Sequence, residues 1–354
     1  MKTFGIIMAG GGGTRFWPLS RKRTPKQLLN LSGKEVMVNE TVDRISTVCK
    51  NEDIYIVTNS LQAEKMQEVT EGRILPKNIL REPSARNTAA CIGYAAIKIA
   101  KDYGDGVMVI TPSDAYVKDT KTFTKVLQTA INAAASSQNL ITVGITPTFP
   151  ATGYGYIKYK EADCEVKSVD CFVEKPNLEN AKKYLESGNY VWNSGIFVWK
   201  ASVILEKFKN LLPDIYSDLL KIEEALNTVD EEKILNAVYP QIRSISIDYG
   251  VMEKSDNILV VPGEFGWNDV GSWDMLGVLH EADENGNVCV GNSLNIDTKN
   301  TTVYSSGKLI ACVGVEDMVI VETADAILVC PKNRVQDVKL AVEALKEKGK
   351  EELL

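Results

Sequence analysis

The residues best suited to chemistry lie near the start of the chain, where the glycines Gly10–Gly13 follow the short apolar run Phe4–Met8. Glycine lets a turn approach a ligand closely, and successive N–H groups in such a turn form a concave anion site. Arg15 and Lys26 follow, and both side chains can bind phosphate. A flexible glycine turn is the alternative. The preceding apolar run and the two cations favour a nucleoside-triphosphate loop at the end of a strand.

Two common phosphate motifs are absent from this stretch. A Walker loop closes with Gly-Lys-Ser or Gly-Lys-Thr, whereas Thr14-Arg15 follows Gly13 here. A dinucleotide fingerprint begins a helix at its last glycine, but Trp17-Pro18 and Pro25 interrupt any helix that starts there. The loop therefore needs a different explanation.

The single histidine of the chain restricts the chemistry further. Histidine is the most frequent general base, yet His280 is the only one among 354 residues. It lies near the end of a predicted apolar helix, where a structural role is favoured over a catalytic one. The sequence therefore predicts a reaction that needs no histidine.

Polar residues follow two further predicted strands. Asp114 comes after the predicted strand 106–112, at the position where open α/β sheets bind ligands. Magnesium prefers one or two carboxylates plus substrate phosphates. A helix N-cap is the alternative role for Asp114. Glu82 precedes a predicted alanine-rich helix with Ser84 and Asn87 as N-cap candidates. A helix N-terminus favours anions, and an acceptor such as Glu82 suits the N–H edge of guanine, although an ordinary capped helix is also possible.

Three later segments offer groups that suit a sugar phosphate. Tyr154 lies between two glycines, where backbone donors are free, although a plain β-turn is nearly as well supported. Glu174 can accept from sugar hydroxyls and Lys175 can supply a point charge, with a surface ion pair as the alternative. Asn193 offers one acceptor and two donors, which fits a diol.

The stretch Gly10–Pro18, followed by Pro25-Lys26-Gln27, resembles the signature of the sugar-phosphate nucleotidyltransferase family. Within this family, the sequence motif Phe-Trp-Pro-Leu-Ser-Arg and the glutamine after Pro-Lys are most similar to the mannose-1-phosphate guanylyltransferase branch (GDP-mannose pyrophosphorylases). The resemblance covers residues 1–285 through several separated motifs. One departure is Ala115, which stands where the guanylyltransferases often have histidine.

The resemblance implies a set of site residues. The catalytic residues that it implies are Arg15, Lys26 and Lys175. The nucleotide-binding residues that it implies are Ala9, Gly10, Gly11, Gly12, Gly13, Thr14, Glu82, Pro83, Asn87, Ala90 and Ser113. The sugar-binding residues that it implies are Gly153, Tyr154, Gly155, Glu174, Asn193 and, as a weaker candidate, Asp248. The resemblance also implies that two aspartates far apart in the sequence, Asp114 and Asp269, hold Mg²⁺. The local sequence around Asp269, taken without the resemblance, predicts only a turn.

The implied reaction is transfer of a guanylyl group from GTP to mannose 1-phosphate, which gives GDP-mannose and pyrophosphate. A phosphate has a second pKa of about 6, so the attacking oxygen needs no base. One alternative is the same chemistry with dTTP or UTP and glucose 1-phosphate. Another is a nucleotide-binding regulatory subunit without turnover, although such relatives usually lose the loop arginine or the metal aspartates.

The elements that must position these residues alternate between strands and helices up to about residue 285. This pattern predicts an α/β fold, and the resemblance implies a Rossmann-like, mixed and mostly parallel sheet. From Gly286 onward, short apolar runs separated by Gly, Asn and Asp predict a small unit of the β-helix type, closed by a helix over 337–345. We therefore expect a catalytic domain over 1–285 and a small β domain with its helix over 286–354. The expected roles of the β domain are cover and subunit contact, in a homodimer.

Composition excludes several classes of function. The net charge is −7 with no basic tract, which argues against nucleic acid as a partner. No apolar run approaches the ~20 residues that span a membrane, and the apolar start is too short for a signal peptide. The 7 cysteines include no Cys-x-x-Cys pair. An odd cysteine count without a secretory signal predicts reduced thiols in the cytoplasm.

Overall fold

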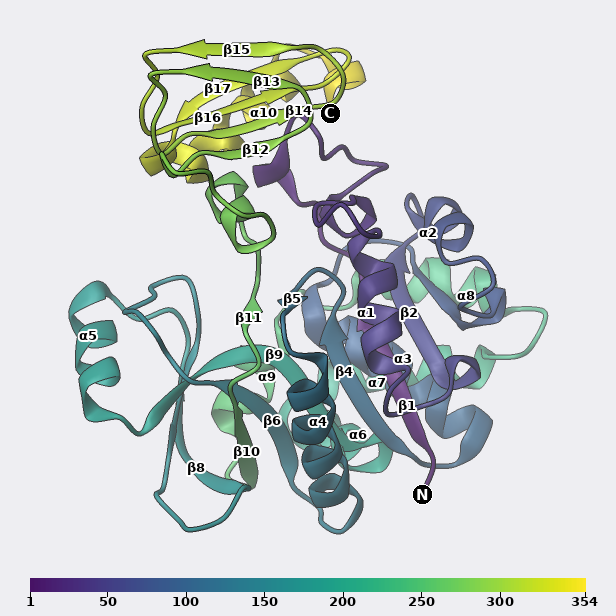
Figure 1. Ribbon diagram of the computed structural model, residues 1–354. Helices are drawn as coiled ribbons and strands as arrows, with labels where there is room; N and C mark the ends of the chain where they lie inside the picture. Colours follow the sequence, from purple (N-terminus) through teal and green to yellow (C-terminus); the bar gives the residue numbers. More distant parts are fainter.

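A nine-stranded sheet forms the centre of the computed structural model, which describes all residues 1–354 (Figure 1). The strand order is β3-β2-β1-β4-β9-β6-β10-β8-β7. The strands are β1 (Thr3–Met8), β2 (Ile54–Asn59), β3 (Ile79–Glu82), β4 (Val107–Pro112), β6 (Leu140–Ile145), β7 (Tyr156–Tyr159), β8 (Lys167–Val173), β9 (Tyr190–Lys200) and β10 (Ile258–Gly263).

The sheet is mixed, as expected, and β9 is the strand that makes it so. Strands β3, β2, β1 and β4 pair in parallel, and so do β6 and β10. Strand β9 lies between β4 and β6 and runs antiparallel to both. Because β1 and β4 are parallel neighbours, the loops that follow them leave the same edge of the sheet.

Helices cover both faces of the sheet, which confirms the predicted α/β fold. Buried side chains of α3 (Asn87–Tyr103), α6 (Ala201–Leu211) and α7 (Pro213–Ala225) fill the core on one face. Those of α1 (Met37–Ile45), α2 (Ala63–Val69) and α4 (Thr120–Ala135) fill the other. The remaining helices of this part are α5 (Leu178–Ser187), α8 (Glu231–Val238) and α9 (Ile247–Gly250). None of the helices is long and apolar enough to span a bilayer.

A small two-stranded ribbon lies apart from the main sheet. Strand β5 (Tyr116–Val117) pairs antiparallel with β11 (Trp267–Asn268), with Tyr116 opposite Asn268. The ribbon joins two segments that are far apart in the sequence, one just after Asp114 and the other just before Asp269. Local sequence patterns did not predict this pairing.

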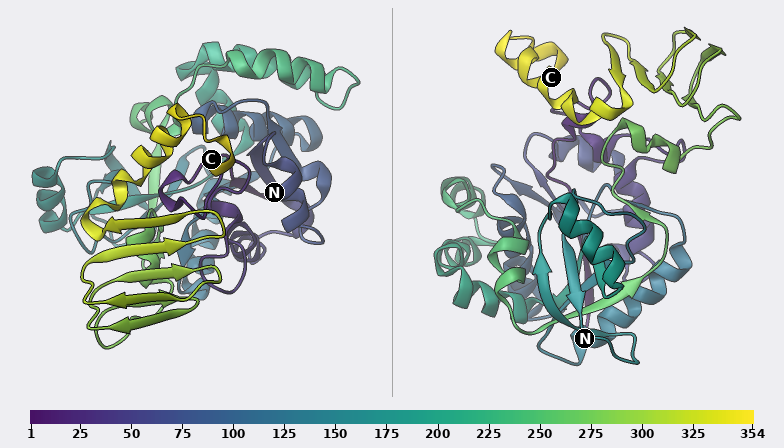
Figure 2. Two further views of the ribbon diagram at one scale, coloured as in Figure 1. Left: turned by 90° about the horizontal axis from the view of Figure 1, so that it is seen from above. Right: turned by 90° about the vertical axis from the view of Figure 1, so that its left-hand side faces the viewer.

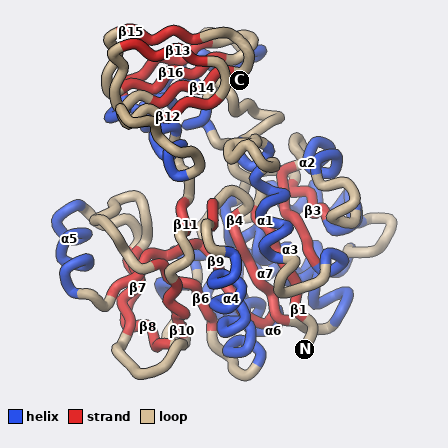
Figure 3. The backbone as a smooth tube through the Cα atoms, viewed as in Figure 1, coloured by secondary structure: helices blue, strands red, loops and turns tan.

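The C-terminal unit consists mainly of short strands, as Figure 3 shows, and has the predicted β-helix type of stacking. Strands β12 (Val288–Val290), β14 (Thr302–Ser305) and β16 (Met318–Glu322) stack in parallel, and β17 (Ile327–Pro331) closes this sheet antiparallel to β16. Strands β13 (Ser293–Ile296) and β15 (Ile310–Val313) form a second parallel pair. The chain ends in α10 (Val338–Glu347) and a short 3₁₀ turn.

The C-terminal unit packs on the loop that follows β1. One buried apolar cluster contains Phe16 and Trp17 of that loop together with Trp273, Val319 and Val338. Figures 1 and 2 show α10 and the C-terminus beside the N-terminal loop, although they lie at opposite ends of the sequence. The glycine loop is therefore held between the main sheet and the C-terminal unit.

Candidate active site

The glycine loop leaves the carboxyl end of β1 and is fixed by the segment around Lys26. Gly13 has φ of 59°, and a Cβ there would lie 2.7 Å from the backbone nitrogen of Lys26, so only glycine fits. The amide of Gln27 donates hydrogen bonds to the carbonyl oxygens of Ala9 (2.8 Å) and Gly11 (3.1 Å). Gln27 is 2 % exposed. Sequence reasoning gave Gln27 no role, because its carbonyl partners come together only in the folded loop.

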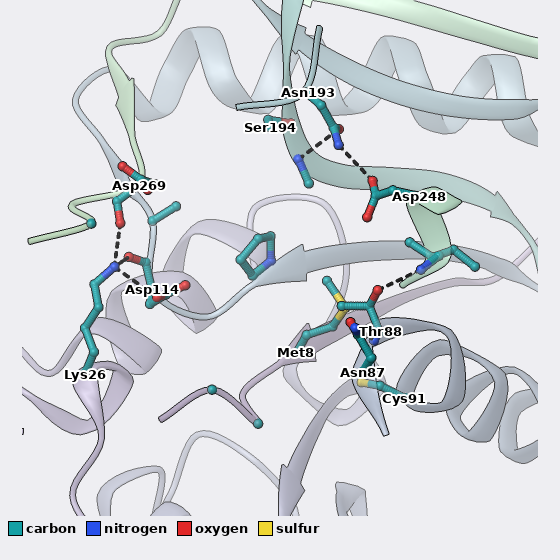
Figure 4. A pocket seen from close by; sticks show the side chains of 18 of the residues that line it. Met8, Lys26, Asn87, Thr88, Cys91, Asp114, Asn193, Ser194, Asp248 and Asp269 are labelled. Atoms are coloured by element: carbon teal, nitrogen blue, oxygen red, sulfur yellow. Dashed lines mark hydrogen bonds and ion pairs between the residues drawn. The ribbon is translucent and has the colours of Figure 1, made fainter. Parts of the chain in front are cut away.

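Lys26 lies between the two aspartates that the sequence analysis assigned to a metal (Figure 4). Its Nζ donates to Oδ2 of Asp114 (2.9 Å), to the backbone oxygen of Asp114 (2.8 Å) and to the backbone oxygen of Asp269 (2.5 Å). The Lys26 side chain is 6 % exposed. An ammonium group has three donors, so these bonds use all of them. Lys26 therefore joins the two aspartate segments, and contact with a phosphate would require it to exchange a partner.

Asp114 and Asp269 open onto one cavity, and their carboxylates fit the donor set of a divalent ion. The Asp114 side chain is 39 % exposed, and Oδ1 of Asp269 accepts a 2.8 Å hydrogen bond from the hydroxyl of Tyr154. Burial raises the pKa of Tyr154, and the Asp269 carboxylate adds to the effect, so the tyrosine stays a donor. The chain has no cluster of three or more His, Cys, Asp or Glu side chains that could hold a metal ion. Two carboxylates suit Mg²⁺ that also takes oxygens from a substrate phosphate.

Glu82 lies buried beside the glycine loop, at the end of β3. The hydroxyl of Tyr239 donates a 2.5 Å hydrogen bond to Oε1 of Glu82, and a Cβ on Gly10 would lie 3.0 Å from Oε2. Burial raises the pKa of Glu82 to about 7, against the opposing effect of the Tyr239 hydrogen bond. The sequence gave no signal for Tyr239, which lies 157 positions further along the chain.

The start of α3 differs from the expectation. Neither Ser84 nor Asn87 caps the helix, because Arg86 occupies the N-cap position without a side-chain hydrogen bond. Asn87 takes a left-handed φ of 64°, and its Oδ1 accepts from the next backbone nitrogen, that of Thr88 (2.8 Å). The predicted cap is therefore wrong, and the Asn87 side chain lines the cavity.

At the sugar-binding end that the sequence predicted, Asn193 and Asp248 meet. Nδ2 of Asn193 donates a 2.9 Å hydrogen bond to Oδ1 of Asp248. Burial, followed by the nearby Glu174 carboxylate, raises the pKa of Asp248 to about 6. Lys175 Nζ lies 2.9 Å from Oε1 of Glu174, and this hydrogen bond raises the pKa of Lys175. A Cβ on Gly155 would lie 2.5 Å from Oε2 of Glu174, which favours glycine there.

Most of the predicted site residues line a single cavity of about 590 Å³. The cavity brings together Gly10, Gly11, Gly13, Arg15, Lys26, Glu82, Asn87, Asp114, Gly153, Tyr154, Gly155, Glu174, Lys175, Asn193, Asp248 and Asp269. The predicted residues that do not line it are Ala9, Gly12, Thr14, Pro83, Ala90 and Ser113. Ala9, Ala90 and Ser113 are buried. The roles predicted for these residues stay predictions, because adjacency in a motif does not decide which way a side chain points.

His280 lies outside the cavity, where its Nε2 is 2.6 Å from the carbonyl oxygen of Leu31. It follows a 3₁₀ helix, Trp273–Val278, rather than the apolar α-helix that the sequence predicted.

The comparisons with known proteins match both parts of the chain. The nucleotidyl transferase family model matches residues 4–286, and the model of the MannoseP isomerase/GMP-like β-helix domain matches residues 291–345. The alginate biosynthesis protein AlgA of Pseudomonas aeruginosa is 39 % identical over 98 % of this chain and 73 % of its own length. A mannose-1-phosphate guanylyltransferase of Salmonella montevideo is 40 % identical over 98 % of this chain and 74 % of its own length.

A solved structure is similar over nearly the whole chain. It is described as a mannose-1-phosphate geranyltransferase from Thermus thermophilus, with a TM-score of 0.89 and 32 % identity. The match covers 98 % of this chain and 100 % of the other. The arrangement of the sheet and the C-terminal unit is therefore shared with that protein.

Proposed function

Because this chain belongs to the nucleotidyl transferase family, we propose that it transfers a guanylyl group from GTP to α-D-mannose 1-phosphate, giving GDP-mannose and pyrophosphate. The observation that supports the proposal is the single cavity, which is lined by the glycine loop, the buried Glu82 and the Asn193–Asp248 pair. Two relatives, at 40 % and 38 % identity, are named mannose-1-phosphate guanylyltransferase, which supports the same reaction.

The base preference follows from Glu82. Tyr239 occupies Oε1, so Oε2, which faces the glycine loop, remains to accept from a ligand. Guanine presents two neighbouring donors, N1–H and N2–H₂, to such an acceptor. Adenine lacks the N1–H, and uracil and thymine present carbonyl oxygens beside their single N–H, which a carboxylate repels. A buried polar group left without its partner costs binding free energy, so Glu82 favours GTP over these nucleotides.

The sugar preference follows from Asn193 and Asp248, which lie across the cavity from Lys26 and Asp114 (Figure 4). Asn193 uses one donor on Asp248, and Asp248 keeps an oxygen free to accept from a hydroxyl. Adjacent amide and carboxylate groups suit neighbouring sugar hydroxyls. Lys175, paired with Glu174 at the same end, would attract the sugar phosphate.

The proposed chemistry is in-line displacement at the α-phosphorus of GTP by a phosphate oxygen of the sugar, with pyrophosphate as the leaving group. This oxygen is largely deprotonated at neutral pH, so the protein supplies position and charge rather than a base. Arg15 and the glycine loop would hold the triphosphate, and Lys26 would keep the two aspartate segments in register while adding a positive charge.

The proposed cofactor is Mg²⁺. Nucleotidyltransferases of this family generally use a divalent metal ion. Asp114 and Asp269 would hold it, and when bound it supplies charge neutralisation for phosphate oxygens.

The test is pyrophosphate release from each pairing of GTP, UTP or dTTP with mannose 1-phosphate or glucose 1-phosphate, with and without Mg²⁺. We expect the highest kcat/KM for GTP with mannose 1-phosphate, and no release after chelation. Preference for a pyrimidine nucleotide would replace this proposal with the corresponding uridylyl- or thymidylyltransferase. Nucleotide binding without any release would favour a regulatory subunit.

We also propose that the chain divides into a catalytic domain, 1–285, and a small β domain with its helix, 286–354, and that it forms a homodimer. The ranges that the two family models match support the division. Exposed apolar side chains on the β unit, Ile296, Val313 and Val329 among them, support a contact with a second copy. Light scattering of the purified chain tests the dimer, and a monomeric mass at micromolar concentration would contradict it.

A further inference from the structure

The C-terminal unit places one side chain at the edge of the active site. Gln336, in the 3₁₀ helix Lys332–Asp337, accepts a 3.1 Å hydrogen bond at Oε1 from Nη1 of Arg15. Its Nε2 donates a 3.0 Å hydrogen bond to Oγ of Ser272. Arg15 lines the cavity, and Ser272 lies on the segment that carries Asp269. One amide therefore connects the phosphate loop with the segment of a proposed metal ligand.

The network around Ser272 decides how this amide is oriented. Ser272 is 2 % exposed, and its hydroxyl donates a 2.6 Å hydrogen bond to Oδ1 of Asp274. A hydroxyl that has donated its hydrogen can only accept from the amide, so the NH₂ group of Gln336 must face Ser272. The carbonyl oxygen of Gln336 then faces Arg15, which can only donate.

The backbone that carries Gln336 is anchored on both sides. Val335 and Val338 are each 3 % exposed and belong to the same buried cluster as Phe16 and Trp17. The indole nitrogen of Trp17 also donates a 2.8 Å hydrogen bond to the carbonyl oxygen of Leu353. The backbone of Gln336 is therefore held in place beside Arg15, although the side chains of both residues are exposed.

We propose that Gln336 is a positioning residue that orients the Arg15 guanidinium toward the triphosphate. This inference rests on the proposed function in one respect, the binding of the triphosphate by Arg15. The amide takes one of five guanidinium donors and carries no charge, so it fixes the group while leaving its positive charge for phosphate. Without the amide, a long exposed side chain occupies several rotamers, and binding must order it.

The first experiment compares steady-state kinetics of the wild type, Gln336→Ala and Asn333→Ala. Asn333 lies in the same 3₁₀ helix and has no side-chain hydrogen bond to the loop, so it serves as the matched control. For Gln336→Ala we expect KM for GTP to rise about five- to tenfold, as for the loss of one ordinary solvent-accessible hydrogen bond. We expect kcat, KM for mannose 1-phosphate and the melting temperature to stay unchanged. A loss of stability with equal changes in both KM values would indicate a merely structural role and overturn the inference.

The second experiment repeats Gln336→Ala in an Arg15→Ala background. If Gln336 acts through Arg15, the substitution changes KM for GTP less than twofold there. The same five- to tenfold effect in both backgrounds, or none in the wild type, would overturn the inference. Gln336→Glu keeps the acceptor but pairs a charge with Arg15, so we expect it to weaken GTP binding more at low salt than at high salt.

Failure of the proposed function would give a different result. If the wild type binds GTP but releases no pyrophosphate with mannose 1-phosphate, the proposed reaction is wrong. Calorimetric affinities of GTP for the same variants then decide the role of Gln336, because the double-variant comparison applies to binding as well as to turnover.

Discussion

The ammonium group of Lys26 lies 2.9 Å from Oδ2 of Asp114, with its remaining hydrogens on two backbone oxygens. Lys26, which the sequence analysis expected to contact the triphosphate, therefore connects the segments of Asp114 and Asp269 by hydrogen bonds. Its charge still lies beside the cavity, so its proposed contribution combines support with attraction of phosphate.

Substitution of this lysine should damage both stability and activity. Lys26→Met leaves two backbone oxygens without a donor, so we expect the free energy of unfolding to fall by about 1–3 kcal/mol. The cost stays below that of a fully buried broken pair, because the Asp114 side chain is 39 % exposed and can take up water. We expect kcat to fall about 100-fold or more, as for loss of one preorganised group that stabilises charge. Urea unfolding and pyrophosphate release measure the two effects, with exposed Lys34→Met as the control.

The aspartates should matter for turnover and not for folding. We expect Asp269→Asn to lower kcat about 100-fold or more, because the amide is a poor ligand for a divalent ion. The fold should be kept, because the asparagine oxygen can still accept from Tyr154. Asp256→Asn, whose side chain is 98 % exposed, is the control. Turnover of Asp269→Asn at the wild-type rate across a Mg²⁺ titration would reject the metal role.

Binding of GTP should depend on the protonation of Glu82. Its pKa of about 7 means that the carboxylate accepts from guanine above that pH and is protonated below it. KM for GTP should therefore rise as the pH falls from 8 to 6, while Glu82→Gln should remove this dependence. Tyr239→Phe removes the hydrogen bond that lowers the Glu82 pKa, so we expect the midpoint to move to higher pH. A midpoint that stays in place would contradict the assignment.

The same group should make stability fall as the pH rises. Since burial raises the folded pKa above the usual value near 4.5, the folded state binds the extra proton between about pH 4.5 and 7. The contribution is fully present below that window and lost through it, by up to about 3 kcal/mol. Chemical unfolding of the wild type and Glu82→Gln at pH 5 and pH 8 measures the difference, and the wild type should lose more stability between the two than the variant.

Removal of the Asp248 charge should affect only the sugar. We expect Asp248→Asn to raise KM for mannose 1-phosphate about tenfold, as for one hydrogen bond to a charged group, and to leave KM for GTP unchanged. In the wild type, that KM should rise below about pH 6, where Asp248 becomes protonated. Exposed Asp163→Asn is the control. Equal effects on both substrates would place Asp248 outside the sugar site.

More of the fold than of the candidate site could be predicted from the sequence. The α/β alternation and the β-helix type of C-terminal unit followed from local periodicity and from the family motifs, and the family and structural matches confirm both. The N-cap prediction failed at Asn87, since propensity does not show that the chain turns left-handed there. Ala9, Ala90 and Ser113 are buried in the protein, which a motif alone cannot indicate.

The sequence by itself determined which groups stand at strand ends, such as the glycine loop after β1 and Asp114 after β4, because strand and turn patterns are local. Only the tertiary structure decided which distant segments meet. The β5–β11 ribbon brings Asp269 to Asp114, Tyr239 reaches Glu82, and Gln336 reaches Arg15. Such contacts depend on long-range packing, which leaves no periodic signal in the chain, so the site became complete only once the fold was known.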